Sequence, residues 1–324
     1  MDENMTGTCE FTRKTAEAII KEAGKVVVGQ YDLIEKIIVT MLSSGHVLLE
    51  GVPGLAKTLA ARAVAKTISS EFKRVQFTPD LMPSDITGTK VFDVKAGSFY
   101  FKKGPLFTNI LLADEINRTP PKTQAALLEA MEERSITIDG ETYNLGEPFL
   151  VIATQNPVEY EGTYPLPEAQ LDRFMLKLKL NYVPQKYENM ILEKYNTNLE
   201  GAKADIQSVK PVCSFEDLKK CREEIVNVRV EPAIVNYITS ITAATRNSPS
   251  LMLGASPRAS IALMLTAKAL AAVQGRNYVT PEDIKELALP VMRHRILLKP
   301  ETSMDGIGSD EVIKSVLNRV EVPR

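Results

Sequence analysis

Residues 51–58 read Gly-Val-Pro-Gly-Leu-Ala-Lys-Thr, and this stretch separates two segments of different periodicity. The short apolar run 46–50 before it is typical of a buried strand, and from Lys57 onward the apolar residues recur at helical spacing. A strand, a glycine-containing loop and a helix in this order place backbone N–H groups at the positive end of a helix dipole. Such an arrangement binds phosphate.

The loop fits the pattern Gly-x-x-x-x-Gly-Lys-Ser/Thr with one departure, because Ala56 stands where the last glycine is expected. In this pattern Lys57 contacts the β- and γ-phosphates and Thr58 holds Mg²⁺. A methyl group at Ala56 is tolerable if the φ of that residue is negative. The alternative interpretation is a simple turn between strand and helix, with a lysine that faces solvent.

Two further strand ends carry polar side chains. Leu111-Leu112-Ala113-Asp114-Glu115 ends an apolar run with two carboxylates, of which Asp114 would belong to the Mg²⁺ shell and Glu115 would polarise the attacking water. Asn156 follows another apolar run and could position water or sense the γ-phosphate. The alternatives are two solvated acidic residues at a strand end, and a turn-forming asparagine before proline.

Working outward, strand candidates alternate with helical stretches, which predicts a parallel sheet covered by helices on both faces. Besides 46–50, the strand candidates are 74–77, 109–113, 149–154 and 175–180. Residues 89–101 and 135–145 are expected to form hairpins inserted between core elements. After Pro184 the strand pattern disappears and five helical segments follow. We therefore expect an α/β domain at residues 1–184 and a helical domain at residues 185–324.

Two arginines have unusual positions. Arg173 lies near the end of the segment 162–174, close to a strand start, and could point out of the subunit, although a cation at a helix C-terminus or a surface ion pair would also explain it. Arg258 lies at a helix N-terminus, where a cation is unfavourable to the helix dipole, so that a phosphate partner would explain its placement. An ordinary exposed arginine is the alternative at that position.

These five pieces, in this order, resemble the AAA+ ATPases and more specifically the MoxR family, from Val28 to about Leu297. The most specific stretches are 76–85, 114–118 and 168–174, and alanine at position 56 is usual in that family's version of the loop. The resemblance implies an α/β fold: a P-loop AAA+ core with a parallel sheet flanked by helices, followed by a C-terminal all-α lid domain. It implies a loop that binds ATP or ADP with Gly51, Val52, Pro53, Gly54, Leu55, Ala56, Lys57, Thr58 and Leu59.

The resemblance also implies roles that the residues alone do not reveal. Val28 and Gly29 look like the adenine-side segment, and Asn156 looks like sensor 1. Arg173 looks like an arginine finger for the nucleotide of a neighbouring subunit, and Arg258 looks like sensor 2 in the nucleotide-binding set. The two hairpins look like the helix-2 insert and the pre-sensor-1 insert. These mark the clade that also holds magnesium chelatase and replicative helicase motors.

The family's known partners give further expectations. Its members are usually hexameric rings that use ATP and Mg²⁺, and they are thought to act as chaperones that mature other proteins. Their partners often contain von Willebrand A-domains. This predicts a homo-oligomer with protein clients.

The composition bounds the remaining possibilities. The 324 residues carry a net charge of −2, which gives no bulk attraction for nucleic acid. The polar N-terminus and the lack of an apolar run near ~20 residues predict neither a signal peptide nor a membrane segment. The chain has three cysteines, an odd and small number that does not indicate a disulfide framework and is typical of a cytoplasmic protein. Two rival functions are a nucleic-acid-stimulated motor and a nucleotide-gated binding module with negligible turnover; the Asp114-Glu115 pair argues against the second.

Overall fold

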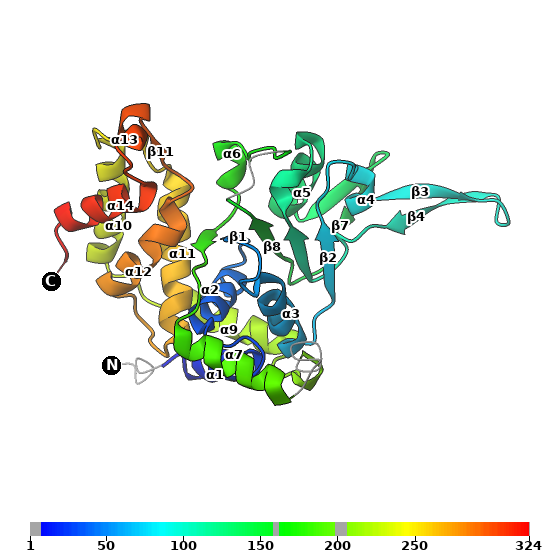
Figure 1. Cartoon of the computed structure of the whole chain (residues 1–324), viewed down its shortest axis with the longest axis horizontal. Helices are drawn as coiled ribbons and strands as arrows, with labels where there is room; N and C mark the ends of the chain where they lie inside the picture. Colours follow the sequence, from blue (N-terminus) through cyan, green and yellow to red (C-terminus); the bar gives the residue numbers. More distant parts are fainter. Residues whose placement is uncertain (1–7, 158–161, 198–205, 324) are drawn as a thin grey trace, which may run out of the picture.

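The computed structural model describes residues 8–157, 162–197 and 206–323. They fold around a five-stranded sheet in the order β2-β5-β8-β1-β9 (Figure 1). Every neighbouring pair in this sheet is parallel, as the sequence predicted. The carboxyl ends of all five strands therefore meet at one edge. The strands are β1 (Val47–Glu50), β2 (Phe72–Gln76), β5 (Ile110–Asp114), β8 (Leu150–Gln155) and β9 (Leu176–Lys179).

Helices cover both faces of the sheet, which explains why the central strands are apolar throughout. Alternate residues such as Leu49 and Leu112 pack into the core under α1 (Glu10–Ala23), α2 (Tyr31–Leu42) and α3 (Lys57–Thr67). The residues between these along each strand, which include Leu48 and Leu111, pack on the opposite face of the sheet. The helices on that face are α4 (Pro83–Thr87) and α5 (Pro121–Glu133). The short η1 (Ile116–Arg118) follows β5.

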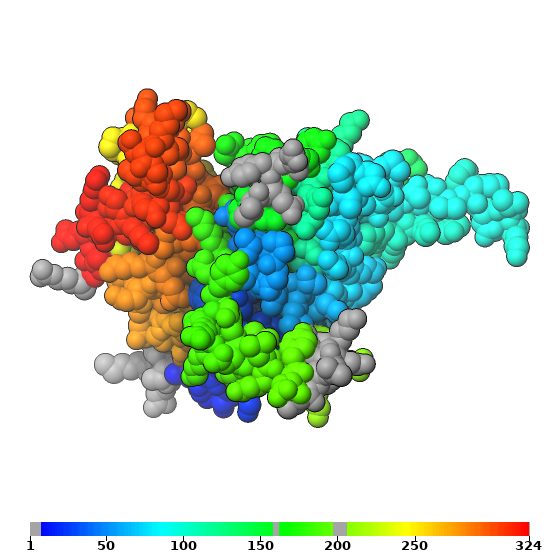
Figure 2. Space-filling view, in the orientation of Figure 1, coloured from blue at the N-terminus to red at the C-terminus, as the bar shows by residue number. Residues whose placement is uncertain are grey.

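Two antiparallel hairpins leave this layered core. Strands β3 (Gly88–Asp93) and β4 (Ser98–Lys103) form a ribbon that projects far from the body of the molecule (Figures 1 and 2). Strands β6 (Ser135–Ile138) and β7 (Glu141–Asn144) are joined by Asp139 and Gly140. Both of these residues have positive φ, 50° and 81°, as a two-residue primed turn requires.

The second half of the chain is mainly helical, and its helices begin at strong start signals. Capping boxes at Ser214 and Thr280 open two of them through reciprocal bonds with Asp217 and Asp283. The expectation of helices alone after Pro184 is wrong in one detail, because β10 (Leu251–Leu253) pairs with β11 (Leu297–Leu298). Strands of two and three residues are too short to give a period. The helices are α6 (Glu168–Leu171), α7 (Gln185–Thr197), α9 (Phe215–Val226), α10 (Pro232–Arg246), α11 (Pro257–Val273), α12 (Pro281–Met292), α13 (Pro300–Met304) and α14 (Ser309–Arg319).

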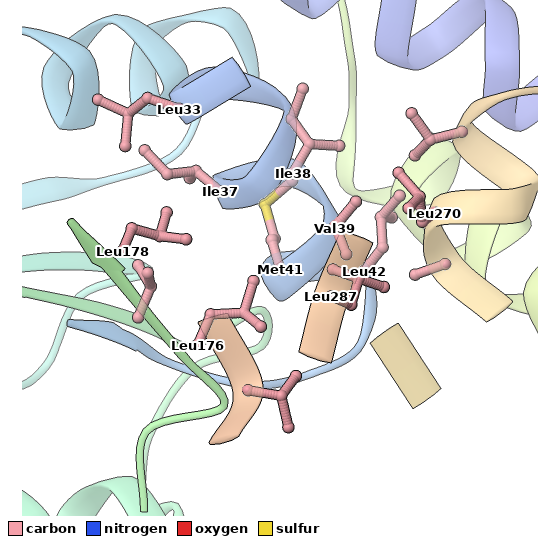
Figure 3. Packing of buried hydrophobic residues seen from close by; sticks show 14 of the residues in the cluster. Leu33, Ile37, Ile38, Val39, Met41, Leu42, Leu176, Leu178, Leu270 and Leu287 are labelled. Carbon is pink, nitrogen blue, oxygen red and sulfur yellow. The ribbon is translucent and has the colours of Figure 1, made fainter. Parts of the chain in front are cut away.

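Helix α2 joins the sheet to these later helices. It is buried nearly all round, so it has no polar face to turn to water. Figure 3 shows Leu176 of β9 on one side of it and Leu270 of α11 on another, and all three elements belong to one continuous core. Lys36 of α2 is only 3% exposed and pairs with Glu286 of α12. Burial alone would lower the pKa of Lys36, but Glu286 and the nearby Asp32 and Glu35 outweigh it and the pKa is raised.

No helix among the residues that the structure describes is both long enough and apolar enough to cross a membrane.

Candidate active site

The glycine-containing loop leaves the carboxyl end of β1 and enters α3 at Lys57. Gly54 has a φ of 90° and Ala56 has a φ of 58°, so the negative φ that would accommodate the Ala56 methyl group without strain is not observed. A left-handed conformation costs a residue with a side chain roughly 1–2 kcal/mol. The loop bears this strain because alternating right- and left-handed residues turn successive N–H groups toward one point, which forms an anion-binding nest.

The loop is closed by contacts of its own residues. Lys57 Nζ donates to the Gly51 carbonyl at 2.5 Å, so the lysine folds back over the loop. Gly51 itself has little room for a side chain, because a Cβ there would lie 3.1 Å from both Leu180 and Leu55. Leu55 is buried against this point, whereas Pro53 and Gly54 are exposed at the tip. The loop is therefore anchored at its base and open where a phosphate would enter.

Asp114 ends β5 at the same edge, two strands away from β1. Its Oδ2 accepts a hydrogen bond from the Thr58 hydroxyl at 3.4 Å, and its Oδ1 accepts one from the buried Thr154 hydroxyl at 2.5 Å. Arg74 of β2 donates to the same Oδ2 from Nε at 3.1 Å and from Nη2 at 2.7 Å. Asp114 is 8% exposed, so these three partners surround a nearly buried carboxylate.

Glu115 is turned by a left-handed backbone, with a φ of 57°. Its N–H donates to the Thr154 hydroxyl at 2.9 Å, so one threonine fixes both acidic residues. The Glu115 Oε2 accepts bonds from Gln76 Nε2 at 2.8 Å and from Arg118 Nη1 at 3.0 Å. Strain and two donors hold this carboxylate in one orientation at the sheet edge.

Asn156 follows β8, and β8 lies between β5 and β1. The asparagine is 5% exposed. It therefore lies at the same edge as Lys57 and Asp114, directly after the strand that separates β1 from β5. The topology thus brings together the loop, the acidic pair and this amide, all of which the sequence had proposed.

Val28 and Gly29 lie in the turn between α1 and α2, and Gly29 lines a cavity of about 390 Å³. Gly29 has a φ of 78°, and a Cβ there would lie 2.7 Å from the ring of Tyr187 on α7. Leu180 lines this cavity and also contacts Gly51, so the cavity adjoins the base of the loop. Helix α12 contributes Glu286, Leu289 and Pro290 to the lining of this cavity, and Arg293, which follows the helix, lines it too.

Arg173 and Arg258 lie elsewhere. Both pair with Glu132 at the end of α5, Arg258 at 3.2 Å, and Arg258 also lies 3.8 Å from Asp172. A cavity of about 270 Å³ lined by these residues is also lined by His46, which directly precedes β1. They therefore lie at the amino-terminal ends of the strands. The expectation that Arg258 joins the loop in one nucleotide-binding set does not hold within a single chain.

The sequence interpretation missed several neighbours of these residues. Arg74, Gln76 and Thr154 bond directly to the acidic pair, Glu132 holds both arginines, and Tyr187 covers Gly29. Strand alternation puts Arg74 and Gln76 on one face, but only the order of the strands shows that β5 is their neighbour. Nothing in the local sequence marks Tyr187 or Glu132.

Comparisons with known proteins agree with this geometry. Residues 46–176 match the family model described as the ATPase family associated with various cellular activities (AAA), and residues 243–316 match the AAA lid domain. The chain is 48% identical to the uncharacterized protein YeaC of Bacillus subtilis, over 94% of this chain and 93% of that protein. It is 43% identical to the chaperone MoxR1 of Mycobacterium tuberculosis, over 96% of this chain and 83% of that one.

A solved structure is similar over nearly its whole length. It is that of a Cytophaga hutchinsonii protein assigned as an ATPase, which superposes with a TM-score of 0.89 at 43% identity. The similarity covers 98% of this chain and 97% of that one, so it includes both the sheet and the later helices.

Proposed function

This chain belongs to the MoxR family of AAA+ ATPases, and we propose that it hydrolyses ATP with Mg²⁺ as a ring that remodels partner proteins. The observation that carries the proposal is the arrangement of Thr58, Asp114 and Glu115. The Thr58 hydroxyl lies 3.4 Å from Asp114 Oδ2, and Thr154 fixes Asp114 and Glu115 together. Phosphoryl transfer requires the metal ligands and the group that activates water to lie close together beside the phosphates.

The donor set at this point fits Mg²⁺. Thr58 and Asp114 offer a hydroxyl and a carboxylate, and Mg²⁺ prefers oxygen ligands. When bound, the ion neutralises charge on the β- and γ-phosphates. Thr58 would hold it directly and Asp114 would orient its shell.

The chain's own residues would supply the rest of the reaction. The N–H groups from Gly51 to Leu59 cradle the phosphates, and Lys57 leaves the Gly51 carbonyl to contact them. Glu115 accepts a proton from the attacking water, and Asn156 holds that water or the γ-phosphate. Positioning and charge stabilisation then provide most of the rate, since phosphoryl transfer needs little covalent help.

The separation of the arginines supports assembly into a ring. Arg173 and Arg258 lie at the amino-terminal ends of the strands, whereas Lys57 lies at the carboxyl ends. The five residue steps of extended chain from position 46 to position 51 span roughly 16 Å. We propose that both arginines serve the nucleotide of a neighbouring subunit in a homo-oligomer, which we expect to be hexameric. We therefore assign Arg258 to the nucleotide site of the neighbouring subunit instead of the site in its own chain.

Two substitutions test the chemistry. Lys57→Ala should lose nucleotide affinity, because the phosphates lose their cation. Glu115→Gln should keep binding but lose turnover by roughly 10²-fold or more, since the general base is gone. Steady-state phosphate release and fluorescent-nucleotide binding measure the two effects. Normal turnover by Glu115→Gln would remove Glu115 as the water activator.

The same assay separates the rival functions. Phosphate release per subunit should rise with protein concentration, because each site needs a neighbour. A nucleotide-gated binding module would release negligible phosphate at every concentration. A salt-sensitive stimulation by DNA would instead favour a nucleic-acid motor.

We propose protein clients, because a 43%-identical relative is named a chaperone, and we include proteins with von Willebrand A-domains among them. The Glu115→Gln variant with ATP should hold such clients, and affinity capture followed by mass spectrometry would identify them. Capture that is the same with ADP would count against nucleotide-controlled binding.

The domain division near residue 184 and a cytoplasmic location remain predictions. The first is supported by the last strand of the main sheet, which ends at Lys179, and by the lid match, which begins at residue 243. The second is supported by three free, buried cysteines. Burial raises the pKa of the Cys213 thiol to about 12, so it is poorly suited to form disulfides.

A further inference from the structure

Arg74 lies on β2, the edge strand of the sheet, on the face that α3 covers. Strand alternation puts Arg74 and Gln76 on this face, whereas Val75 packs into the core on the other one. Gln76 is the register partner of Asp114, and Arg74 is the partner of Leu112, two positions earlier. A long side chain at such a diagonal position can reach its neighbour across the strands.

The Arg74 side chain extends to Asp114 and forms an ion pair with its carboxylate. Two of its N–H groups, at 3.1 and 2.7 Å, point at Oδ2, the oxygen that also lies 3.4 Å from the Thr58 hydroxyl. The other oxygen is taken by Thr154. The Asp114 side chain is 11% exposed but the Arg74 side chain is 49% exposed. The Arg74 side chain is therefore accessible to water, whereas the Asp114 carboxylate is nearly inaccessible.

We propose that Arg74 is a stand-in cation, which neutralises Asp114 in the metal-free subunit and gives way when Mg²⁺ and nucleotide bind. The inference rests on the proposed function for the metal and the nucleotide. A nearly buried carboxylate without a positive partner is costly, so Asp114 needs a positive charge near Oδ2 before Mg²⁺ binds. A half-exposed guanidinium can return to water at little cost, because pairs that are open to solvent are weak.

The contacts of Arg74 extend to the second acidic residue. Arg74 Nη2 donates to Gln76 Oε1 at 3.0 Å, and the Gln76 amide nitrogen donates to Glu115 Oε2 at 2.8 Å. One amide thus connects the cation on Asp114 to the carboxylate that would activate water. When Arg74 leaves Asp114, its hold on Gln76 is released as well, so that binding of the metal is transmitted to Glu115.

The test titrates Mg²⁺ into the full-length protein with a fluorescent, non-hydrolysable ATP analogue and reads binding, without turnover. Arg74→Gln should lower the half-saturating Mg²⁺ concentration by about fivefold, because the competitor is gone. In EDTA the same variant should bind the analogue more weakly than wild type, since Asp114 then repels the phosphates. Arg74→Lys keeps the charge and should lie between the two.

A matched control is Lys73→Gln. Lys73 is the adjacent cation on β2, points to the other face and contacts Glu71 and the Phe107 carbonyl. It should leave the Mg²⁺ titration unchanged. Thermal unfolding of each variant shows that it is folded.

A half-saturating Mg²⁺ concentration that is unchanged or raised in Arg74→Gln would overturn the proposal. The effect of Arg74→Gln should also vanish in an Asp114→Asn background, and an effect that persists there would contradict the competition for Asp114. Failure of the proposed function has a different signature, since wild type would then bind no analogue with or without Mg²⁺.

Discussion

Arg173, just before β9, and Arg258, at the start of α11, are held by one carboxylate, that of Glu132 at the end of α5. Their guanidinium groups are brought together although they are far apart in the sequence. Both are partly exposed, with 30% and 59% of the side chain accessible. A paired set of arginines on an open face is suited to meet the phosphates of another subunit.

Mixing experiments test this arrangement. Arg173→Ala and Arg258→Ala should each bind nucleotide but lose turnover, Arg173→Ala by roughly 10³-fold, as expected for an arginine finger. Mixing either variant with Lys57→Ala should restore part of the phosphate release, because Lys57→Ala subunits still present both arginines to a neighbour.

The control for these mixtures is Arg229→Ala. Arg229 is more than half exposed and its ion pair with Glu231 is long, at 4.0 Å, so its loss should leave turnover unchanged. An absence of recovery in mixtures that light scattering shows to be co-assembled would rule out an arginine in trans.

Glu132→Gln should show whether Glu132 or the neighbouring subunit positions the two arginines. The amide keeps the shape of the side chain but loses the charge that attracts both guanidinium groups. We expect turnover to fall by roughly tenfold with unchanged nucleotide affinity, because the arginines lose their preferred geometry. A variant that turns over like wild type would show that the neighbouring subunit alone orients the arginines.

Gln76→Ala removes one of the two donors that hold Glu115. The carboxylate then samples more orientations, so kcat should fall by roughly three- to tenfold while the nucleotide Kd is unchanged. Gln155→Ala serves as the control, since Gln155 ends a neighbouring strand and bonds Glu50 instead. Equal effects of the two substitutions on kcat would indicate general damage to the sheet edge.

Ala56→Gly should stabilise the fold. It removes a left-handed strain of roughly 1–2 kcal/mol and adds flexibility to the unfolded chain worth roughly 0.4–1 kcal/mol, so the net gain is up to about 1.6 kcal/mol. Urea unfolding measures it. In contrast, Ala63→Gly, inside α3, should destabilise by at least about 1 kcal/mol. A similar loss for Ala56→Gly would show that this residue is not strained.

The stability of the fold should fall as the pH drops from about 6.5 toward 4. Burial lowers the pKa of His46 to about 4, and its neutral ring accepts a hydrogen bond from the Val151 N–H and bonds the Met131 carbonyl. Above the unfolded pKa of about 6.5 both states are neutral; below it the unfolded state binds more protons and is favoured.

Urea unfolding at pH 7.5 and pH 5 tests the role of this histidine. His46→Asn keeps an acceptor for Val151 but cannot titrate, so its loss of stability between the two pH values should be smaller than that of wild type by up to about 2 kcal/mol. The acidic residues titrate equally in both proteins. Equal losses would show that the pKa of His46 is the same in the folded and unfolded states, as for a histidine that is exposed in solution.

Much of the site could be predicted because its residues are local to strand ends. Lys57 and Thr58 follow β1, Asp114 and Glu115 follow β5, and parallel pairing brings such ends to one edge. The φ of Ala56 could not be predicted from its residue type, because alanine normally avoids the left-handed region and only the loop's need to gather N–H groups imposes it.

The sequence by itself determined the parallel sheet, the loop and the acidic pair, since these depend on periodicity and on chemistry within a few residues. The tertiary structure alone decided which side chains neighbour them. Arg74 reaches Asp114 only because β2 lies beside β5, and Arg258 meets Arg173 only because α11 packs near the end of α5. Such contacts depend on the order of the strands and the packing of the helices, which no local pattern encodes.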